Sequence, residues 1–244
     1  MSLSLFDFRL KQFSLKQGNT AMKVGTDAIV LGSWAASLPL SPSRILDIGT
    51  GTGIILFMLM QELSPAWGIG IDIAESLKID AVFNQKNSPW NGCTELILGD
   101  VLVYTPEERF DLIVSNPPYF EAEGVSCLNY EREQARREQK RGLTLTRLMH
   151  KASQLLEPEG EFLLITPLNR EQDLRLYATE ALLRLSRYVI VYSLPGRPLR
   201  LLSGWKPLLT SESYHPTNRS TLTLRKNDGS YTNEYLHLTA PFLL

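Results

Sequence analysis

The chain has 244 residues, of which 43% are apolar and 21% charged, and its formal net charge is −1. A chain of this length and apolar content can bury one full hydrophobic core. Its nearly balanced charge excludes a generally basic protein, so any surface that binds nucleic acid must be local. The longest uninterrupted apolar run, residues 54–60, is too short to cross a bilayer, and no membrane-spanning helix is expected.

Cysteine usage and the start of the chain bear on the cellular compartment. Cys93 and Cys127, the two cysteines, have neither metal-ligand spacing nor the density of a disulfide framework. Charged residues interrupt the N-terminal stretch from Asp7 onward, so no secretory signal peptide is expected. The three histidines are scattered and suggest no metal site. These features predict a cytoplasmic protein that binds neither a metal nor a membrane.

In chain order, strand-like and helix-like segments alternate with short connections. Strands are expected near 44–48, 68–72, 95–99, 110–115, 161–166, 188–194 and 220–226. Helices are expected near 27–36, 53–63, 74–87, 144–156 and 169–185. This alternation predicts an α/β fold, with a mostly parallel seven-stranded sheet, helices on both faces and ligands at the carboxyl ends of the strands.

The same pattern predicts a single domain over residues 1–244. Residues 1–43 precede the first strand of the sheet. Prolines and glycines are frequent in the stretch 195–218, which is expected to form a long basic loop between the last two strands. Thr26 or Asp27 is expected to cap the first helix.

Residues 44–53, Arg-Ile-Leu-Asp-Ile-Gly-Thr-Gly-Thr-Gly, are typical of a strand that runs into a glycine-rich turn before a helix. Glycines let the backbone approach a ligand closely, and a helix start offers unpaired N–H groups. The next strand ends in Asp72, 19 positions after Gly53, which is the distance expected for an acid that binds a ribose. Dinucleotide and S-adenosylmethionine cofactors both fit this pattern.

Three features favour S-adenosylmethionine over a dinucleotide. Asp47 lies inside the first turn, where it would repel a pyrophosphate but could help to hold an α-amino group. The glycines Gly49, Gly51 and Gly53 follow a G-x-G-x-G pattern and not G-x-G-x-x-G. A third strand is followed by Asp100, a carboxylate placed to bind an adenine amino group. Aspartates are common in turns at strand ends, so each acid alone could be only structural.

The run Asn116-Pro117-Pro118-Tyr119 closes the strand expected at 110–115. Two consecutive prolines fix φ and remove two backbone donors, and Pro117 restricts Asn116 to an extended conformation. Such a corner can present the Asn116 carboxamide and the Pro117 carbonyl as a pair of acceptors, with Tyr119 beside them as a flat platform. This arrangement suits a planar substrate that bears an NH2 group. An ordinary turn after a strand is the alternative.

These motifs, together with segments elsewhere in the chain, resemble the bacterial tRNA1(Val) adenine-37 N6-methyltransferase family. The further segments are 8–13, 21–27, 31–34 and 132–136. The resemblance covers most of residues 6–166 and thins over the last third. It implies a Rossmann-like class I S-adenosylmethionine-dependent methyltransferase in which residues 1–43 cover the cofactor and substrate site. The reaction it implies is N6-methylation of an unpaired adenosine 37 in tRNA, without activity on DNA.

The resemblance also implies roles for individual residues. The cofactor-binding set is Asp47, Gly49, Gly51, Asp72 and Asp100. Asn116 would accept a hydrogen bond from the target amine, Pro117 would supply a second acceptor, and Tyr119 would stack on the base. The exocyclic amine of adenine is a weak nucleophile because its lone pair is delocalised into the ring. Two acceptors would assist by aiming that lone pair at the methyl group.

Local basic segments are candidates for holding the RNA. Arg136 follows the N-P-P-Y corner, and Arg197 and Arg200 lie in a stretch without acids that also offers Trp205 for stacking. Arg136, Arg197 and Arg200 are therefore predicted RNA contacts. Solvated charge runs are the alternative, and the segment that contains Arg136 could instead brace the corner. The oligomeric state stays open, with a monomer favoured.

Three other functions fit parts of the pattern. A protein glutamine N5-methyltransferase acting on a release factor uses the same acceptor chemistry, but such enzymes carry a sizeable helical domain before the glycine turn. Only 43 residues precede Arg44 here. A DNA adenine methyltransferase usually needs a target-recognition region for which this chain has little room. An RNA-binding module without turnover would not need an intact Asn116.

Overall fold

The computed structural model describes residues 7–18, 23–75, 77–118, 143–208 and 219–244. The strands are β1 (Asp7–Arg9), β2 (Ser14–Lys16), β3 (Arg44–Ile48), β4 (Trp67–Asp72), β5 (Thr94–Leu98), β6 (Phe110–Ser115), β7 (Leu156–Pro167), β8 (Leu183–Leu194), β9 (Arg197–Pro207) and β10 (Arg219–Thr223). The α-helices are α1 (Thr26–Ala36), α2 (Ile54–Leu63), α3 (Leu77–Lys86), α5 (Leu145–Leu155), α6 (Glu171–Glu180) and α7 (Asn233–Thr239). Short 3-10 helices are η1 (Asn91–Cys93), η2 (Val101–Val103) and η3 (Leu168–Arg170).

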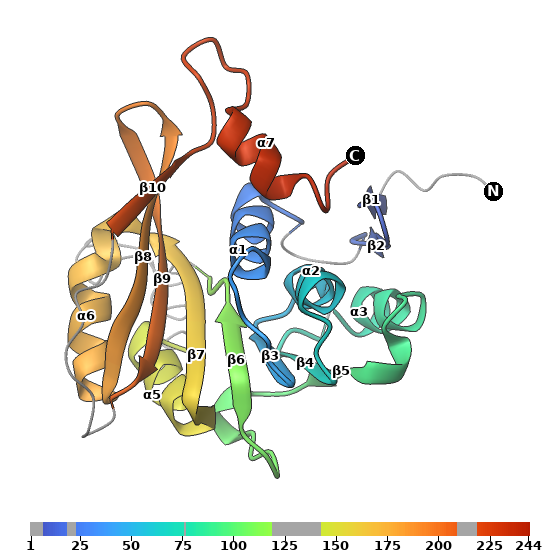
Figure 1. The fold of residues 1–244 in the computed structure, drawn as a ribbon. Coiled ribbons are helices and arrows are strands. Elements are labelled where there is room, and N and C mark those ends of the chain that lie inside the picture. Colours follow the sequence, from blue (N-terminus) through green and yellow to red (C-terminus); the bar gives the residue numbers. More distant parts are fainter. Residues whose placement is uncertain (1–6, 19–22, 76, 119–142, 209–218) are drawn as a thin grey trace, which may run out of the picture.

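A sheet with the strand order β10-β8-β9-β7-β6-β3-β4-β5 forms the centre of the molecule. Its neighbouring strands run parallel except at β9, which is antiparallel to both β7 and β8. Helices α1, α2 and α7 lie on one face, and α5 and α6 lie on the other (Figure 1). The predicted mostly parallel sheet with helices on both faces is confirmed, but the sheet has eight strands and not seven.

The central strands are apolar because both of their faces are covered. Leu46 of β3 and Ile113 of β6 pack under α5, whereas Ile45 of β3 and Val114 of β6 belong to the core beneath α1 and α2. Parallel strands that are buried on both faces read as continuous apolar runs and not as alternating ones. Turn residues bound each run, and the bounds predicted for β3 and β6 are confirmed.

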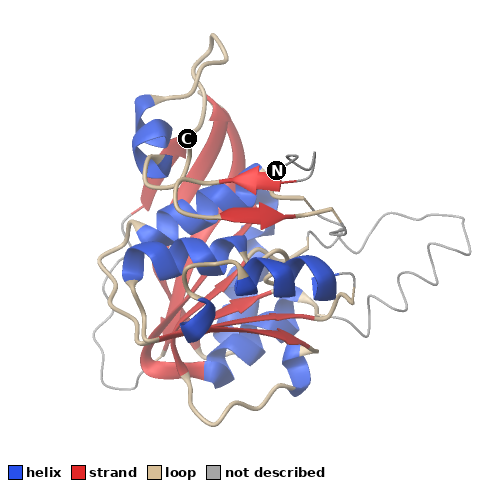
Figure 2. Cartoon of the chain, turned by 90° about the vertical axis from the view of Figure 1, so that its right-hand side faces the viewer, coloured by secondary structure: helices blue, strands red, loops and turns tan. Residues whose placement is uncertain are grey.

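The N-terminal residues form a small structure outside the main sheet. Strands β1 and β2 pair antiparallel with each other, and Figure 2 shows this hairpin beside the helices and apart from the large sheet. The backbone N–H of Lys11 donates to the carbonyl of Phe242 at 2.8 Å, and Lys11 Nζ donates to the carbonyl of Ala240 at 2.6 Å. The two ends of the described chain therefore pack together on the helical face that carries α1 and α7 (Figure 1).

The predicted loop at 195–218 is wrong over most of its described part, because Arg197–Pro207 form β9 in the interior of the sheet. The run from Leu201 to Trp205 is buried at every position, so it shows no alternation that would indicate a strand. Pro198 lies at an irregular step in the pairing with β8, where a missing N–H is tolerated. At Gly204 a Cβ would lie 2.8 Å from both Glu161 Oε1 and Ser186 Oγ, so the close packing of the strands requires glycine.

The helix predicted at 169–185 is shorter in the structure. α6 ends at Glu180, and Leu182 turns the chain with a positive φ of 56° before β8 begins. Tyr188 of β8 donates its hydroxyl proton to Glu171 of α6 at 2.7 Å, which fixes the helix against the strand. Tertiary pairing with β9 extends β8 backward into residues whose composition suits a helix.

Among the helices of the described ranges, none has the length and apolar character of a membrane span.

Candidate active site

The carboxyl ends of the central strands bring most of the predicted site residues to one edge of the sheet. β3 lies between β4 and β6, and Ile48 at its end is paired with Ile71 on one side and with Ser115 on the other. β5 lies beyond β4. The glycine turn therefore follows a central strand that carries Asp47, with Asp72 and Asp100 on one side of it and Asn116 on the other.

The glycine turn is fastened on one side and open on the other. Gly49 and Gly51 have positive φ angles of 74° and 55°. The Gly49 N–H donates to the carbonyl of Ile71 at 2.8 Å, and the Gly51 N–H donates to the carboxylate of Asp72 at 3.0 Å. A Cβ built at either glycine would meet no atom within 4 Å. The turn is therefore held to β4 while leaving space for a ligand to approach its backbone.

Asp47, at the end of β3, is fully buried. Thr50 Oγ1 donates to Asp47 Oδ2 at 2.8 Å, whereas Asp47 Oδ1 has no hydrogen-bond partner among the described residues. Burial raises the pKa of Asp47 to about 7; the hydrogen bond from Thr50 opposes this shift, and the nearby charge of Asp72 adds to it. A buried acceptor without a partner is costly, so Oδ1 marks a place where a ligand donor would be stabilised.

Asp72 and Asp100 both have structural partners. Asp72 accepts the N–H of Gly51 on Oδ2 and the N–H of Ala74 on Oδ1. Asp100 caps η2, because its Oδ1 accepts the N–H of Leu102 at 2.9 Å. The structural role that turn aspartates commonly have is thus present at both positions. A carboxylate oxygen can accept a second hydrogen bond, so these contacts leave acceptor capacity for a ligand.

The corner after β6 begins at the same edge. Ser115 is buried and donates its hydroxyl proton to the carbonyl of Ile48 at 2.8 Å, which ties the end of β6 to the start of the glycine turn. Asn116 is half-buried, Pro117 is buried and Pro118 is exposed. Tyr119 and Arg136, which the sequence predicts as a stacking residue and an RNA contact, lie outside the described residues.

Arg200 is engaged inside the protein. Its Nε lies 3.0 Å from Asp27 Oδ2, and only about a fifth of either side chain is exposed. Asp27 therefore pairs with Arg200; the capping role predicted for Thr26 or Asp27 is wrong, because Gly25 is the N-cap residue of α1.

Arg197 is exposed at the turn between β8 and β9. Of the two predicted RNA contacts in this hairpin, Arg197 presents its charge to solvent and Arg200 pairs across to α1.

The stacking role predicted for Trp205 is wrong. The side chain is only 3% exposed and belongs to the core on the α5–α6 side of the sheet. Its indole N–H donates to Ser203 Oγ at 3.0 Å, so the polar atom is satisfied internally. A buried, hydrogen-bonded indole cannot stack on a base.

Ile73, for which the sequence analysis predicts no role, directly follows Asp72 at the carboxyl edge and is 68% exposed. Its position next to the acid expected to bind a ribose is visible in the sequence, and an apolar side chain there is suited to pack against a purine ring.

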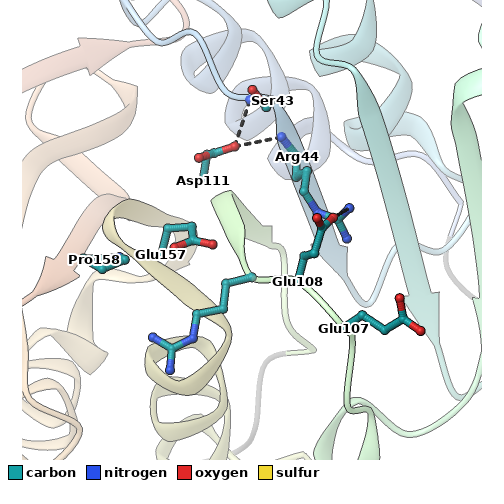
Figure 3. Close-up of a pocket in the computed structure, with 8 residues that line it drawn as sticks. Ser43, Arg44, Glu107, Glu108, Asp111, Glu157 and Pro158 are labelled. Carbon is teal, nitrogen blue, oxygen red and sulfur yellow. Dashed lines mark hydrogen bonds and ion pairs between the residues drawn. The ribbon is translucent and has the colours of Figure 1, made fainter.

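A hollow of about 580 Å³ lies at the opposite, amino-terminal edge of the sheet. It is lined by Ser43, Arg44, Glu107, Glu108, Arg109, Asp111, Glu157 and Pro158. Figure 3 shows Asp111 directed toward the start of β3, where it accepts the N–H groups of Ser43 and Arg44 at 2.8 and 2.9 Å. None of the predicted site residues lines this hollow. The described residues also contain no group of three or more His, Cys, Asp or Glu side chains suited to hold a metal.

Solved structures support the fold. A predicted O-methyltransferase from Agrobacterium tumefaciens superposes with a TM-score of 0.66 at 17% identity, covering 88% of this chain and 96% of that one. A ribosomal protein L11 methylase from Lactobacillus delbrueckii gives a TM-score of 0.56 at 16% identity, covering 82% and 100%. At these identities the similarity concerns the fold alone.

Sequence comparisons are more specific. A family model described as a methyltransferase domain matches residues 40–203. A tRNA1(Val) (adenine(37)-N6)-methyltransferase from Porphyromonas gingivalis is 41% identical, covering 96% of this chain and 94% of that protein. The protein of the same name from Phocaeicola vulgatus is 37% identical, covering 97% of both. The glycine turn, the acids beside it and the Asn-Pro-Pro corner thus stand in a chain that belongs to the tRNA1(Val) (adenine(37)-N6)-methyltransferase family.

Proposed function

We propose that this protein transfers a methyl group from S-adenosylmethionine to the N6 atom of adenosine 37 in tRNA1(Val). The observation that carries the proposal is the placement of Asn116 and Pro117 beside the glycine turn, joined through the hydrogen bond from Ser115 to Ile48. This juxtaposition puts a pair of acceptors next to an open, backbone-lined cofactor site. The relatives that match nearly the whole chain are named for that reaction.

The residues at the edge of the sheet fit S-adenosylmethionine. Asp47 Oδ1 lacks a partner and lies beneath the turn, where an ammonium group or its bound water would satisfy it. The open sides of Gly49 and Gly51 allow close approach of the cofactor. Asp72 is suited to the ribose hydroxyls and Asp100 to the adenine amine, in keeping with the acceptor capacity left on their carboxylates. Ile73 would form an apolar wall for the purine ring.

Asn116 and Pro117 would act on the substrate amine. When bound, S-adenosylmethionine supplies a methyl group that is activated for transfer by its positively charged sulfur. The Asn116 side-chain oxygen and the Pro117 carbonyl would each accept an N–H of the adenine amine, which favours a pyramidal nitrogen with its lone pair aimed at the methyl carbon. Positive charge that develops on that nitrogen is stabilised by the same two acceptors. No general base is needed before transfer begins, because the N6 proton becomes acidic only as the new N–C bond forms; the proton then leaves to solvent, and S-adenosylhomocysteine is the other product.

The target base must leave its stack to reach this corner. An unpaired adenosine in an anticodon loop leaves at lower cost than a base in a duplex. Tyr119 is proposed to stack on the base and Arg136 to contact the RNA. Residues 1–43 are proposed to cover the site. A monomer that acts on tRNA in the cytoplasm is the state we propose for the enzyme.

The test of the substrate class is methyl transfer from labelled S-adenosylmethionine to an unmodified tRNA pool, with duplex DNA and a release factor in parallel. Nucleoside digestion then identifies the methylated base. Label in N6-methyladenosine from the tRNA supports the proposal. Label confined to the release factor would instead indicate the protein glutamine N5-methyltransferase alternative, and label in DNA would indicate a DNA methyltransferase.

Asp47→Asn is expected to stabilise the free protein at pH 8. The pKa of Asp47 is raised from 3.8 to about 7 in the folded state, so between these values the folded state holds a proton that the unfolded state has lost. Stability contributed by this group therefore falls as pH rises from about 4 to about 7. The amide stays neutral throughout, and the variant should gain up to roughly 4 kcal/mol at pH 8.

Urea unfolding from pH 4.5 to 8 measures this effect, and calorimetry measures the cofactor affinity of the same variant. The gain in stability should shrink toward low pH, while S-adenosylmethionine binds more weakly than to the wild type. Parallel pH profiles for the two proteins would show that Asp47 is charged in the folded state at neutral pH.

Arg197→Ala is expected to weaken tRNA binding severalfold without changing the melting temperature. The side chain is exposed at the β8–β9 turn, so its loss removes a phosphate contact and no internal one. Titration at several salt concentrations should show a salt slope reduced by roughly one. Arg175→Ala is the matched control, because Arg175 is an exposed arginine on α6 that pairs with Glu171. Equal effects of the two substitutions on tRNA affinity would show that the β8–β9 hairpin does not contact the tRNA.

A further inference from the structure

Asn84 of α3 joins two segments that are distant in the sequence. Its side chain is only 1% exposed. Asn84 Oδ1 accepts the backbone N–H of Lys16 at 2.7 Å, and Nδ2 donates to the Lys16 carbonyl at 2.9 Å. The same Nδ2 donates to the carbonyl of Thr52 at 3.0 Å. An asparagine side chain can form four hydrogen bonds, and Asn84 thus forms three of them with the backbone of β2 and of the glycine turn.

The hairpin held by Asn84 is also seated by apolar packing. Phe13 makes edge-on contacts with Phe57 of α2 and with Trp90, at centroid distances of 5.8 and 5.4 Å. Lys16 Nζ lies 3.8 Å above the ring of Phe83 on α3. The β1–β2 hairpin is therefore packed onto α2 and α3, and Asn84 links this packed unit to the turn.

Thr52 lies between two glycines with positive φ, Gly51 at 55° and Gly53 at 87°. Such a turn is held by its hydrogen bonds and not by backbone preference, because glycine has many accessible conformations. Bonds to β4 fix its N–H groups, as described above for Gly49 and Gly51. The Asn84 amide holds the carbonyl of Thr52, so both N–H groups and a carbonyl of the turn are restrained, while the space beside Gly49 and Gly51 stays open.

We propose that Asn84 is a positioning residue for cofactor binding, which holds the glycine turn in its binding conformation and couples the turn to the N-terminal hairpin. The cofactor part of this proposal rests on the proposed function, which places S-adenosylmethionine at the turn. The coupling part concerns the free protein. Asn84 is not among the residues proposed to contact the target amine, so its loss should lower cofactor affinity by more than it lowers tRNA affinity.

Hydrogen exchange of the free protein tests the coupling directly. Asn84→Ala should speed exchange in peptides that cover 7–18 and 47–54, whereas the control Asn87→Ala should not. Asn87 is an exposed asparagine directly after α3, and its side chain donates to the carbonyl of Phe83 within the same segment. Unchanged exchange over 47–54 in Asn84→Ala would overturn the proposal. Asn84→Ser keeps a small polar side chain that cannot reach all three partners, and serves if the alanine variant fails to fold.

Calorimetry with S-adenosylmethionine alone supplies the second readout. Asn84→Ala should weaken binding by about tenfold, the loss expected for one buried hydrogen bond, with a smaller loss of affinity for tRNA. Phe13→Ala should weaken it too by loosening the hairpin, and the double variant should bind little worse than Asn84→Ala. Additive losses, or a lower melting temperature with unchanged Kd, would overturn the coupling. A wild-type protein that binds no S-adenosylmethionine would count against the proposed function, while the exchange experiment would still decide the coupling.

Discussion

Asn116→Ala is expected to lower kcat for tRNA methylation by roughly 10²–10³-fold while Kd for S-adenosylmethionine stays within twofold of wild type. Asn116 lies at the corner after β6, across β3 from Asp72 and Asp100. Removing it deletes one of two acceptors for the target amine, and the remaining Pro117 carbonyl cannot orient the lone pair alone. Single-turnover kinetics with a pre-bound cofactor measure the chemical step.

Asn169→Ala is the matched control for this loss. Asn169 is exposed in η3, directly after β7, and so belongs to the same edge of the sheet. It lies outside the proposed acceptor pair, so its removal should leave kcat near that of wild type. Near-normal turnover of Asn116→Ala would contradict the mechanism, as would an equal loss in both variants.

Gly51→Ala is expected to weaken S-adenosylmethionine binding by about 100-fold. Gly51 has a φ of 55°, and a Cβ there would project into space that no atom of the protein occupies within 4 Å. The methyl group would therefore stand where the cofactor approaches the turn. The cost in the free protein is the left-handed backbone alone, about 1–2 kcal/mol. Isothermal titration with S-adenosylmethionine measures the loss of affinity.

Gly229→Ala separates this steric effect from backbone strain. Gly229 has a φ of 84° with nothing within 4 Å of a built Cβ, and it lies in the turn before α7 and not at the site. Both substitutions should lower the melting temperature by similar amounts, but only Gly51→Ala should lose cofactor affinity. Equal affinities in the two variants would place the cofactor away from the glycine turn.

Local sequence patterns were sufficient to predict the part of the site that lies at the ends of the central strands β3 and β6. β3 and β6 are short apolar runs bounded by turn residues, and their carboxyl ends meet because parallel strands share an edge. Asp47, Gly51 and Asn116 follow directly from those two strand ends. Their neighbourhood could therefore be predicted without knowing the rest of the fold.

Other features depend on contacts between distant residues and could not be predicted. The Arg200–Asp27 pair spans 173 positions, and Asn84 reaches both Lys16 and Thr52. β9 was predicted as a loop because prolines and glycines are frequent there, and its buried run 201–205 has no alternation that would have indicated a strand. Trp205 was predicted to stack on a base because its neighbours are basic, although it is a core residue. The sequence shows which residues are charged, but their exposure to solvent depends on how the strands pair in the folded protein.

Adenosine 37 of tRNA1(Val) is the nucleoside that we propose this protein methylates. The most direct measurement uses unmodified tRNA1(Val) transcripts, one with adenosine and one with guanosine at position 37, and maps methyl groups after nuclease digestion. The proposed function predicts one N6-methyladenosine per adenosine-37 transcript, located at that position, and none in the guanosine transcript. Equal labelling of both transcripts, or methylation at another nucleotide, would contradict it.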